Sequence, residues 1–243
     1  MFLIDDQYAP LTDKIVAAIE KIAPGQEIRF VLNTHWHGDH TGGNENLGER
    51  GALIVAHDNV RERMSVEQVI EAFGQTVPAS PKVALPVVTF PDAVTFHLNG
   101  ETIRAHHVPP AQTDGDSFVY FEQADVLHTG DLFFNGFYPF IDVSSGGGVD
   151  GMIAASERML EVASDSTKII PGHGPLADRD DLVAFRDMLL GVRDVMAPMV
   201  AEGLSLEEIQ AADPLAPWNE NWGGGFLTPQ AFTGILFQSW SED

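Results

Sequence analysis

Hydrophobic residues in the first seventy positions follow two rhythms: short apolar runs, and stretches in which apolar residues recur at helical spacing. This alternation of predicted strands and helices is typical of a layered α/β domain. Pro78, Pro81 and Pro86 then predict a loop over residues 75–88. The elements predicted in this part are strands at residues 2–4, 28–32 and 52–56 and helices at 11–23 and 58–73.

The pattern after residue 93 changes to short apolar runs of β type, followed by long helical stretches. Asn99-Gly100, between the first two runs, is a strong hairpin signal. We expect a single domain over residues 1–243, with a C-terminal helical portion from about 180 to 243 packed on it. The predicted elements are strands at 94–98, 102–108, 117–121, 126–128 and 168–170 and helices at 150–163, 180–201 and 229–237.

The net charge of the chain limits the classes of partner that it is expected to bind. The sequence carries 13 Lys and Arg residues against 36 Asp and Glu residues, a formal net charge of −23. This charge repels phosphate backbones and anionic lipid surfaces, so nucleic acid and membrane partners are not expected, whereas a small-molecule substrate is. No apolar run approaches the roughly 20 residues of a membrane helix. Because there is no cysteine, any metal must be held by His, Asp, Asn or Gln side chains.

The chemistry of the chain is concentrated in one run, HWHGDH at residues 35–40. Three imidazoles and a carboxylate at this density suit one or two transition metals, with zinc as the leading choice and iron or manganese as alternatives. Residues 29–32 predict a buried strand, and the end of a strand is a rigid place from which to present metal ligands. A solvated His-rich turn is the competing interpretation, and a pattern of this length disfavours it.

Three later positions can complete a metal site, because each follows a predicted strand or lies in a sharp turn. They are Gln112 in the sequence QTDGD, Asp131 in TGD and His173 in PGHG. Taken in order with HxHxDH, these motifs resemble the metallo-β-lactamase-fold hydrolases over almost the whole chain. The resemblance implies an α/β fold, an αβ/βα four-layer sandwich of two sheets with helices outside, and a two-metal site at one edge.

The same resemblance implies a ligand set and a reaction. The first metal would be held by His35, His37 and Gln112, and the second by Asp39, His40 and His173, with Asp131 bridging the two. A hydroxide held between the cations would attack the substrate carbonyl, with Asp39 and Asp131 as the catalytic carboxylates. The implied function is zinc-dependent hydrolysis of a small ester, thioester, lactone or amide.

Asp131 narrows the group of hydrolases that the chain resembles. Dedicated β-lactamases of this fold generally carry Cys or Ser at that position, whereas a bridging carboxylate is similar to glyoxalase II-type thioesterases and lactonases. A simple turn acid after Gly130 is the competing interpretation. We therefore expect a glyoxalase II-like or lactonase-like hydrolase and not a dedicated β-lactamase.

Gln112 departs from the family pattern, which carries a histidine there. Its amide oxygen is a weaker ligand for zinc than imidazole, so we expect a weakened first metal site and a stronger second one. His106 or His107 is an alternative ligand, although neighbouring residues of a strand face opposite sides. A catalytically impaired metal-binding homologue, which recognises a ligand or partner, is the alternative function.

The first residues are the second departure from the family. The family usually places a β-hairpin before the strand at residues 2–4, and this sequence starts inside that strand, so the N-terminal hairpin is expected to be missing. The unpaired sheet edge would then favour association into homo-oligomers. Since resembling proteins are often exported, we expect a periplasmic or secreted parent whose leader belongs to the same lost segment.

Aromatic and glycine-rich segments are the candidates for a substrate pocket. Residues 132–140 directly follow Asp131 and are expected to supply an apolar wall, with Phe133 and Phe140 in the core instead. Residues 218–226, rich in Trp and Gly, predict either a pocket wall or surface packing of large rings. Residues 144–148 predict a flexible loop, and no lysine follows to make it a phosphate cradle.

Overall fold

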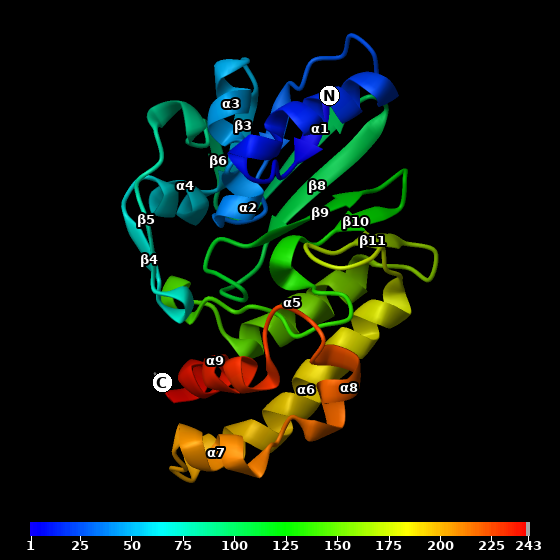
Figure 1. The fold of residues 1–243 in the computed structure, drawn as a ribbon. Coiled ribbons are helices and arrows are strands. Elements are labelled where there is room, and N and C mark those ends of the chain that lie inside the picture. The colour runs from blue at the N-terminus through cyan, green and yellow to red at the C-terminus, as the bar shows by residue number, and fades with distance from the viewer. Residues whose placement is uncertain (242–243) are drawn as a thin grey trace. The chain divides into compact units, whose positions relative to one another are not determined.

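A computed structural model describes residues 1–241 of the chain. It divides the chain into two compact units, one covering Met1–Val94 and the other beginning at Thr95. Each unit has its own sheet and its own helices, labelled in Figure 1. The single domain over residues 1–243 stays a prediction, and the two units are described in turn.

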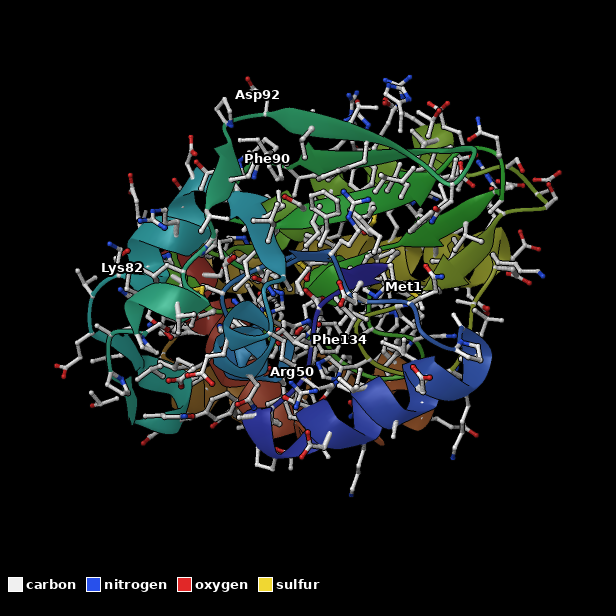
Figure 2. The ribbon with its side chains drawn as sticks, turned by 90° about the horizontal axis from the view of Figure 1, so that it is seen from above. Met1, Arg50, Lys82, Phe90, Asp92 and Phe134 are labelled. Atoms are coloured by element: carbon white, nitrogen blue, oxygen red, sulfur yellow. The ribbon has the colours of Figure 1, made fainter. Side chains whose placement is uncertain are left out.

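The first unit is built on a sheet of four parallel strands in the order β1-β2-β3-β6. Ile4 pairs with Leu32, and Leu32 with Val55, so β1, β2 and β3 end at the same edge of the sheet. Residues that follow these strands are therefore neighbours in space. The strands are β1 (Phe2–Ile4), β2 (Phe30–Leu32), β3 (Leu53–His57) and β6 (Val88–Phe90), whose end is marked by the labels of Phe90 and Asp92 in Figure 2.

Helices of the first unit bury their apolar stripes against this sheet. Val16 of α1 packs with Leu3 and Ile28 on a core formed by Val31, Leu47, Ala52 and Ile54. The helical elements are η1 (Ala9–Leu11), α1 (Thr12–Ile22), α2 (Gly38–Thr41), α3 (Asn44–Glu49), α4 (Asp58–Met64), η2 (Glu71–Phe73) and η3 (Lys82–Ala84).

The helix predicted over residues 58–73 is too long. It ends at Met64 and is followed by an antiparallel pair, β4 (Gln68–Ile70) and β5 (Gln75–Val77). The β-branched residues of these strands favour extended structure, and Gly74, in the left-handed region with φ of 58°, makes the turn before β5. The loop predicted over residues 75–88 accordingly contains β5 and η3.

The second unit is built on a five-stranded sheet in the order β11-β10-β9-β8-β7. β8, β9 and β10 pair antiparallel, and β10 and β11 pair parallel. Asn99 and Gly100, with φ of 57° and 77°, form the predicted turn between β7 and β8. The strands are β7 (Ala93–Leu98), β8 (Glu101–His107), β9 (Ser117–Phe121), β10 (Val126–His128) and β11 (Lys168–Ile170).

Helices make up most of the remaining second unit, where α6 packs against α5 and α9 (Figure 1). Residues 218–222 belong to α8, so only the residues after Trp222 form the predicted Trp- and Gly-rich loop. Among the described residues, no helix combines the length and apolarity that crossing a membrane requires. The helical elements are η4 (Gly130–Leu132), η5 (Val143–Ser145), α5 (Val149–Val162), α6 (Arg179–Ala201), α7 (Leu206–Ala212), α8 (Ala216–Trp222) and α9 (Pro229–Ser241).

Candidate metal centre

The HWHGDH run leaves the end of β2 and folds back on itself through the short helix α2. The side-chain amide of Asn33 donates to the His40 carbonyl at 3.0 Å, and the Thr41 hydroxyl lies 3.0 Å from the His37 carbonyl. These bonds tie both ends of the run together, so that side chains separated by up to five positions converge.

The four predicted ligands of the first unit lie together. His35 Nε2 is 3.1 Å from His37 Nδ1, and His40 Nε2 is 3.5 Å from Asp39 Oδ2. The rings of His35 and His40 are 4.1 Å apart between centroids. All three histidines are buried. Imidazole nitrogens gathered this closely in a buried loop fit a transition metal.

Asp5 sets the orientation of two of these rings. Its Oδ2 lies 2.7 Å from His40 Nδ1 and accepts the Thr34 hydroxyl proton at 2.8 Å. A carboxylate only accepts, so His40 carries its proton on Nδ1, and its lone pair lies on Nε2, the atom that would bind a metal.

Thr34 fixes the position of the ring proton of His35 in the same way. Because its hydroxyl proton points to Asp5, its oxygen accepts from His35 Nδ1, 3.1 Å away. The lone pair of His35 Nε2 is thereby directed toward His37 Nδ1.

Sequence reasoning missed the role of Asp5, although a signal was available. Asp5 follows β1, and β1 and β2 pair in parallel with Ile4 opposite Leu32. A carboxylate placed just after one strand therefore reaches residues placed just after its neighbour. Asp5 has φ of 54°, a left-handed conformation that Asp tolerates better than most residues.

Asp6 is a second buried carboxyl group beside the run. Its Oδ1 accepts from the Gly43 backbone amide at 2.8 Å, which fixes the start of α3. Burial raises the pKa of Asp6 to about 8, and the negative charge of Asp5 acts in the same direction, whereas the Gly43 hydrogen bond opposes it. Asp6 therefore loses its proton less readily than an ordinary carboxyl group.

Asp131 and His173 form the corresponding pair in the second unit. His128 of β10 pairs with Ile170 of β11, and each predicted ligand lies three residues beyond its strand. This shared offset brings Asp131 Oδ2 to 3.4 Å from His173 Nε2. Gly172 is required between them, because a Cβ there would lie 2.1 Å from Asp131 Oδ1.

Gln112 lies in a buried loop that Asp116 holds in shape. Asp116 Oδ2 accepts from the backbone amides of Gln112 and Thr113 at 2.6 and 2.7 Å. Burial raises the pKa of Asp116 to about 7, against the effect of these hydrogen bonds, and the charge of Asp131 adds to the rise. Asp116 therefore holds the backbone of the loop that carries Gln112.

Residues 144–148 are not the flexible loop that their glycines predict. The Ser145 carbonyl accepts from Asp114 at 3.0 Å, and the Gly148 amide donates to Ala111 at 2.8 Å. The segment therefore packs as a brace against the loop that carries Gln112.

The alternative ligands His106 and His107 have other contacts. The ring of His106 stacks on Phe118 with centroids 5.2 Å apart, and burial lowers its pKa. Nδ1 of His107 lies 2.9 Å from the Asp116 carbonyl oxygen. His106 thus contacts a residue of β9, and His107 contacts the residue just before β9.

The aromatic residues that follow Asp131 lie partly in the core and partly against a predicted metal ligand. Phe133 is fully buried against Phe185, as expected, and Phe140 is 5% exposed. Phe134, labelled in Figure 2, stacks on His173 with ring centroids 5.0 Å apart. The ring that contacts a predicted ligand is therefore Phe134.

Comparison of the chain with known proteins finds a family whose model spans these motifs. The family model described as the metallo-beta-lactamase superfamily matches residues 10–176. A metallo-beta-lactamase from Pontibacter korlensis superposes with a TM-score of 0.63 at 21% identity, covering 78% of this chain and 81% of that one. This likeness confirms the predicted metallo-β-lactamase fold.

Curated relatives carry the name hydroxyacylglutathione hydrolase. One from Polaromonas sp. is 29% identical over 70% of this chain, and one from Erythrobacter litoralis is 30% identical over 83%. The alignments cover 60% of the first relative and 76% of the second. The chain therefore spans less than two thirds of the length of the Polaromonas protein.

Proposed function

The chain belongs to the metallo-beta-lactamase superfamily, and from this membership we propose that it is a zinc-dependent hydrolase of small esters or thioesters. The observation that carries the proposal is the orientation of His35 and His40 by Asp5 and Thr34, which assigns the ring protons to Nδ1 and so makes Nε2 of each ring the ligand atom. The names of the relatives support a thioester, because a hydroxyacylglutathione is one.

The proposed ligands come from both units. His35, His37 and Gln112 would hold a first metal, Asp39, His40 and His173 a second, and Asp131 would bridge them, as the order of the family's motifs implies. A bound divalent metal supplies a Lewis acid that lowers the pKa of water and polarises a carbonyl group. Zinc fits this set of imidazole and carboxylate donors, with iron and manganese as alternatives.

The side chains of this chain contribute orientation and proton transfer. Asp5 and Thr34 hold the ring tautomers of His40 and His35 in the form that binds a metal through Nε2. Asp39 and Asp131 are proposed as the catalytic carboxylates: Asp131 would hold the metals, and Asp39 would also take up a proton during hydrolysis.

The test is hydrolysis of p-nitrophenyl esters and of a neutral thioester by the zinc-loaded chain, with and without a chelator. We expect turnover that the chelator abolishes and added zinc restores. His40→Ala should lose it, whereas His97→Ala, which changes an exposed histidine of β7, should keep it. Turnover that is insensitive to chelator, or retained in His40→Ala, would contradict the proposal.

Gln112 favours one second candidate, a metal-binding homologue with impaired catalysis. An amide in place of imidazole weakens the first set of ligands while the second set keeps Asp39, His40 and His173. Metal bound at the second set, with no chelator-sensitive turnover of any ester or thioester, would support this candidate over the enzyme.

A further inference from the structure

Phe226 is an exposed aromatic ring held beside a proposed metal ligand. It is 57% exposed, and its ring centroid lies 6.4 Å from those of His173 and Phe134 and 6.3 Å from that of Phe137. All four rings belong to the second unit. Phe226 thus extends the stack of the buried Phe134 on the half-buried His173 toward solvent.

The loop that leads to Phe226 is anchored at two points. The Tyr138 amide donates to the Trp222 carbonyl at 2.9 Å, which ties the end of α8 to the aromatic segment. Gly225 seats the loop closely, because a Cβ at that position would lie 2.5 Å from the Cβ of Phe137. The ring is therefore presented by an anchored loop.

The C-terminal segment that carries Phe226 contributes no basic side chain. Residues 194–243 contain no Lys, Arg or His. The chain as a whole carries a net charge of −23. An anionic acyl group, or a leaving group with several carboxylates such as glutathione, would find no cation on this segment and would be repelled by its acids.

We propose that Phe226 is a specificity-determining residue, and that with Phe137 it binds an uncharged, apolar or aromatic acyl group of the substrate next to His173. This inference rests on the hydrolase function proposed above. Apolar acyl groups bury area against the exposed ring, and rings prefer the tilted and edge-on contacts already present in this cluster.

The test compares p-nitrophenyl acetate, hexanoate and phenylacetate as substrates of the zinc-loaded full chain. Phe226→Ala should lower kcat/KM for hexanoate and phenylacetate by about tenfold and leave acetate within about twofold. Phe226→Leu should restore much of the hexanoate rate. Phe73→Ala, which removes another exposed ring in the first unit, is the matched control and should change none of the three.

Two results would overturn the inference. Equal loss on all three esters would indicate a structural role for Phe226, and equal retention would indicate no role. A readout without turnover separates this inference from the proposed function: saturation-transfer NMR with phenylacetamide, a neutral probe, against acetamide. Wild type should show contact with phenylacetamide that Phe226→Ala loses, and absence of contact in wild type would overturn the inference even where no ester is hydrolysed.

Discussion

Asp5 Oδ2 lies 2.7 Å from His40 Nδ1, and this pair joins the residue after the first strand to the last histidine of the HWHGDH run. The contact assigns the ring proton to Nδ1 and leaves Nε2 as the ligand atom. Asp5 is therefore a positioning residue, because it acts on the metal through the ring it holds.

Asp5→Asn should weaken zinc binding by about 10- to 100-fold, because the amide nitrogen can face His40 Nδ1 and disturb its tautomer. Asn tolerates the left-handed backbone at this position, so the fold should persist. Competition with a fluorescent chelator measures the affinity. Asp13→Asn, at an exposed carboxylate paired with Arg50, is the control. Unchanged zinc affinity in Asp5→Asn would refute the positioning role.

Gln112→His should raise the zinc affinity of the weaker site by about tenfold or more, because imidazole replaces an amide oxygen. Elemental analysis after dialysis against limiting zinc gives the number of ions per chain. Gln123→His places the same new side chain at an exposed position and should leave the number unchanged. Two ions at full occupancy in wild type, with no gain in Gln112→His, would show that the first site is not weakened.

Gly172→Ala should destabilise the chain by about 1–3 kcal/mol and reduce metal binding, because the new Cβ would meet Asp131 Oδ1 and the Gly130 carbonyl. Urea unfolding and zinc titration check both effects. Gly234→Ala is the contrasting variant: nothing lies within 4 Å of a Cβ there, in the middle of α9, so stability should rise by up to about 1 kcal/mol. Equal stabilities of the two variants would contradict the close approach.

The Asp125 carboxylate is expected to make a pH-dependent contribution to the stability of the fold. The hydroxyls of Ser166 and Thr167 hold its pKa below the ordinary value of 3.8, and the Tyr120 hydroxyl adds to this. Because the pKa of Asp125 is lower in the folded state than in the unfolded state, its ionised carboxylate stabilises the fold at pH values above the unfolded-state pKa. That stabilisation is lost as the pH falls through the folded-state pKa.

Asp125→Asn keeps the left-handed backbone, with φ of 52° in the wild-type residue, and should cost about 1 kcal/mol at pH 7. The difference from wild type in urea unfolding should shrink below about pH 4. Asp92→Asn, at an exposed carboxyl group labelled in Figure 2, is the control. A difference that does not change with pH would mean that the charge of Asp125 contributes nothing.

Much of the fold was predictable from the sequence because its signals are local. The predicted Asn99-Gly100 turn is present, since it depends on neighbouring residues alone. The helix predicted over residues 58–73 was wrong after Met64, where pairing between β4 and β5 decides the structure. The β-branched residues of these strands and the turn at Gly74 outweigh the helical spacing of the apolar residues there.

In the candidate centre, too, local motifs were predictable and contacts between distant segments were not. Histidine spacing identified the side chains of the run, which the structure brings together in the first unit. The proton assignment by Asp5 needed the parallel register of β1 and β2, and the brace formed by residues 144–148 needed the packing of two distant loops. A glycine-rich sequence predicts flexibility, whereas here it permits close contact.

The most direct test of the central claim is anomalous scattering at the zinc edge from crystals of the zinc-loaded chain. The account predicts a peak at about 2.0–2.2 Å from His40 Nε2, Asp39 and His173, and a weaker second peak at His35 and His37. Zinc bound elsewhere, or no bound zinc at these side chains, would contradict it.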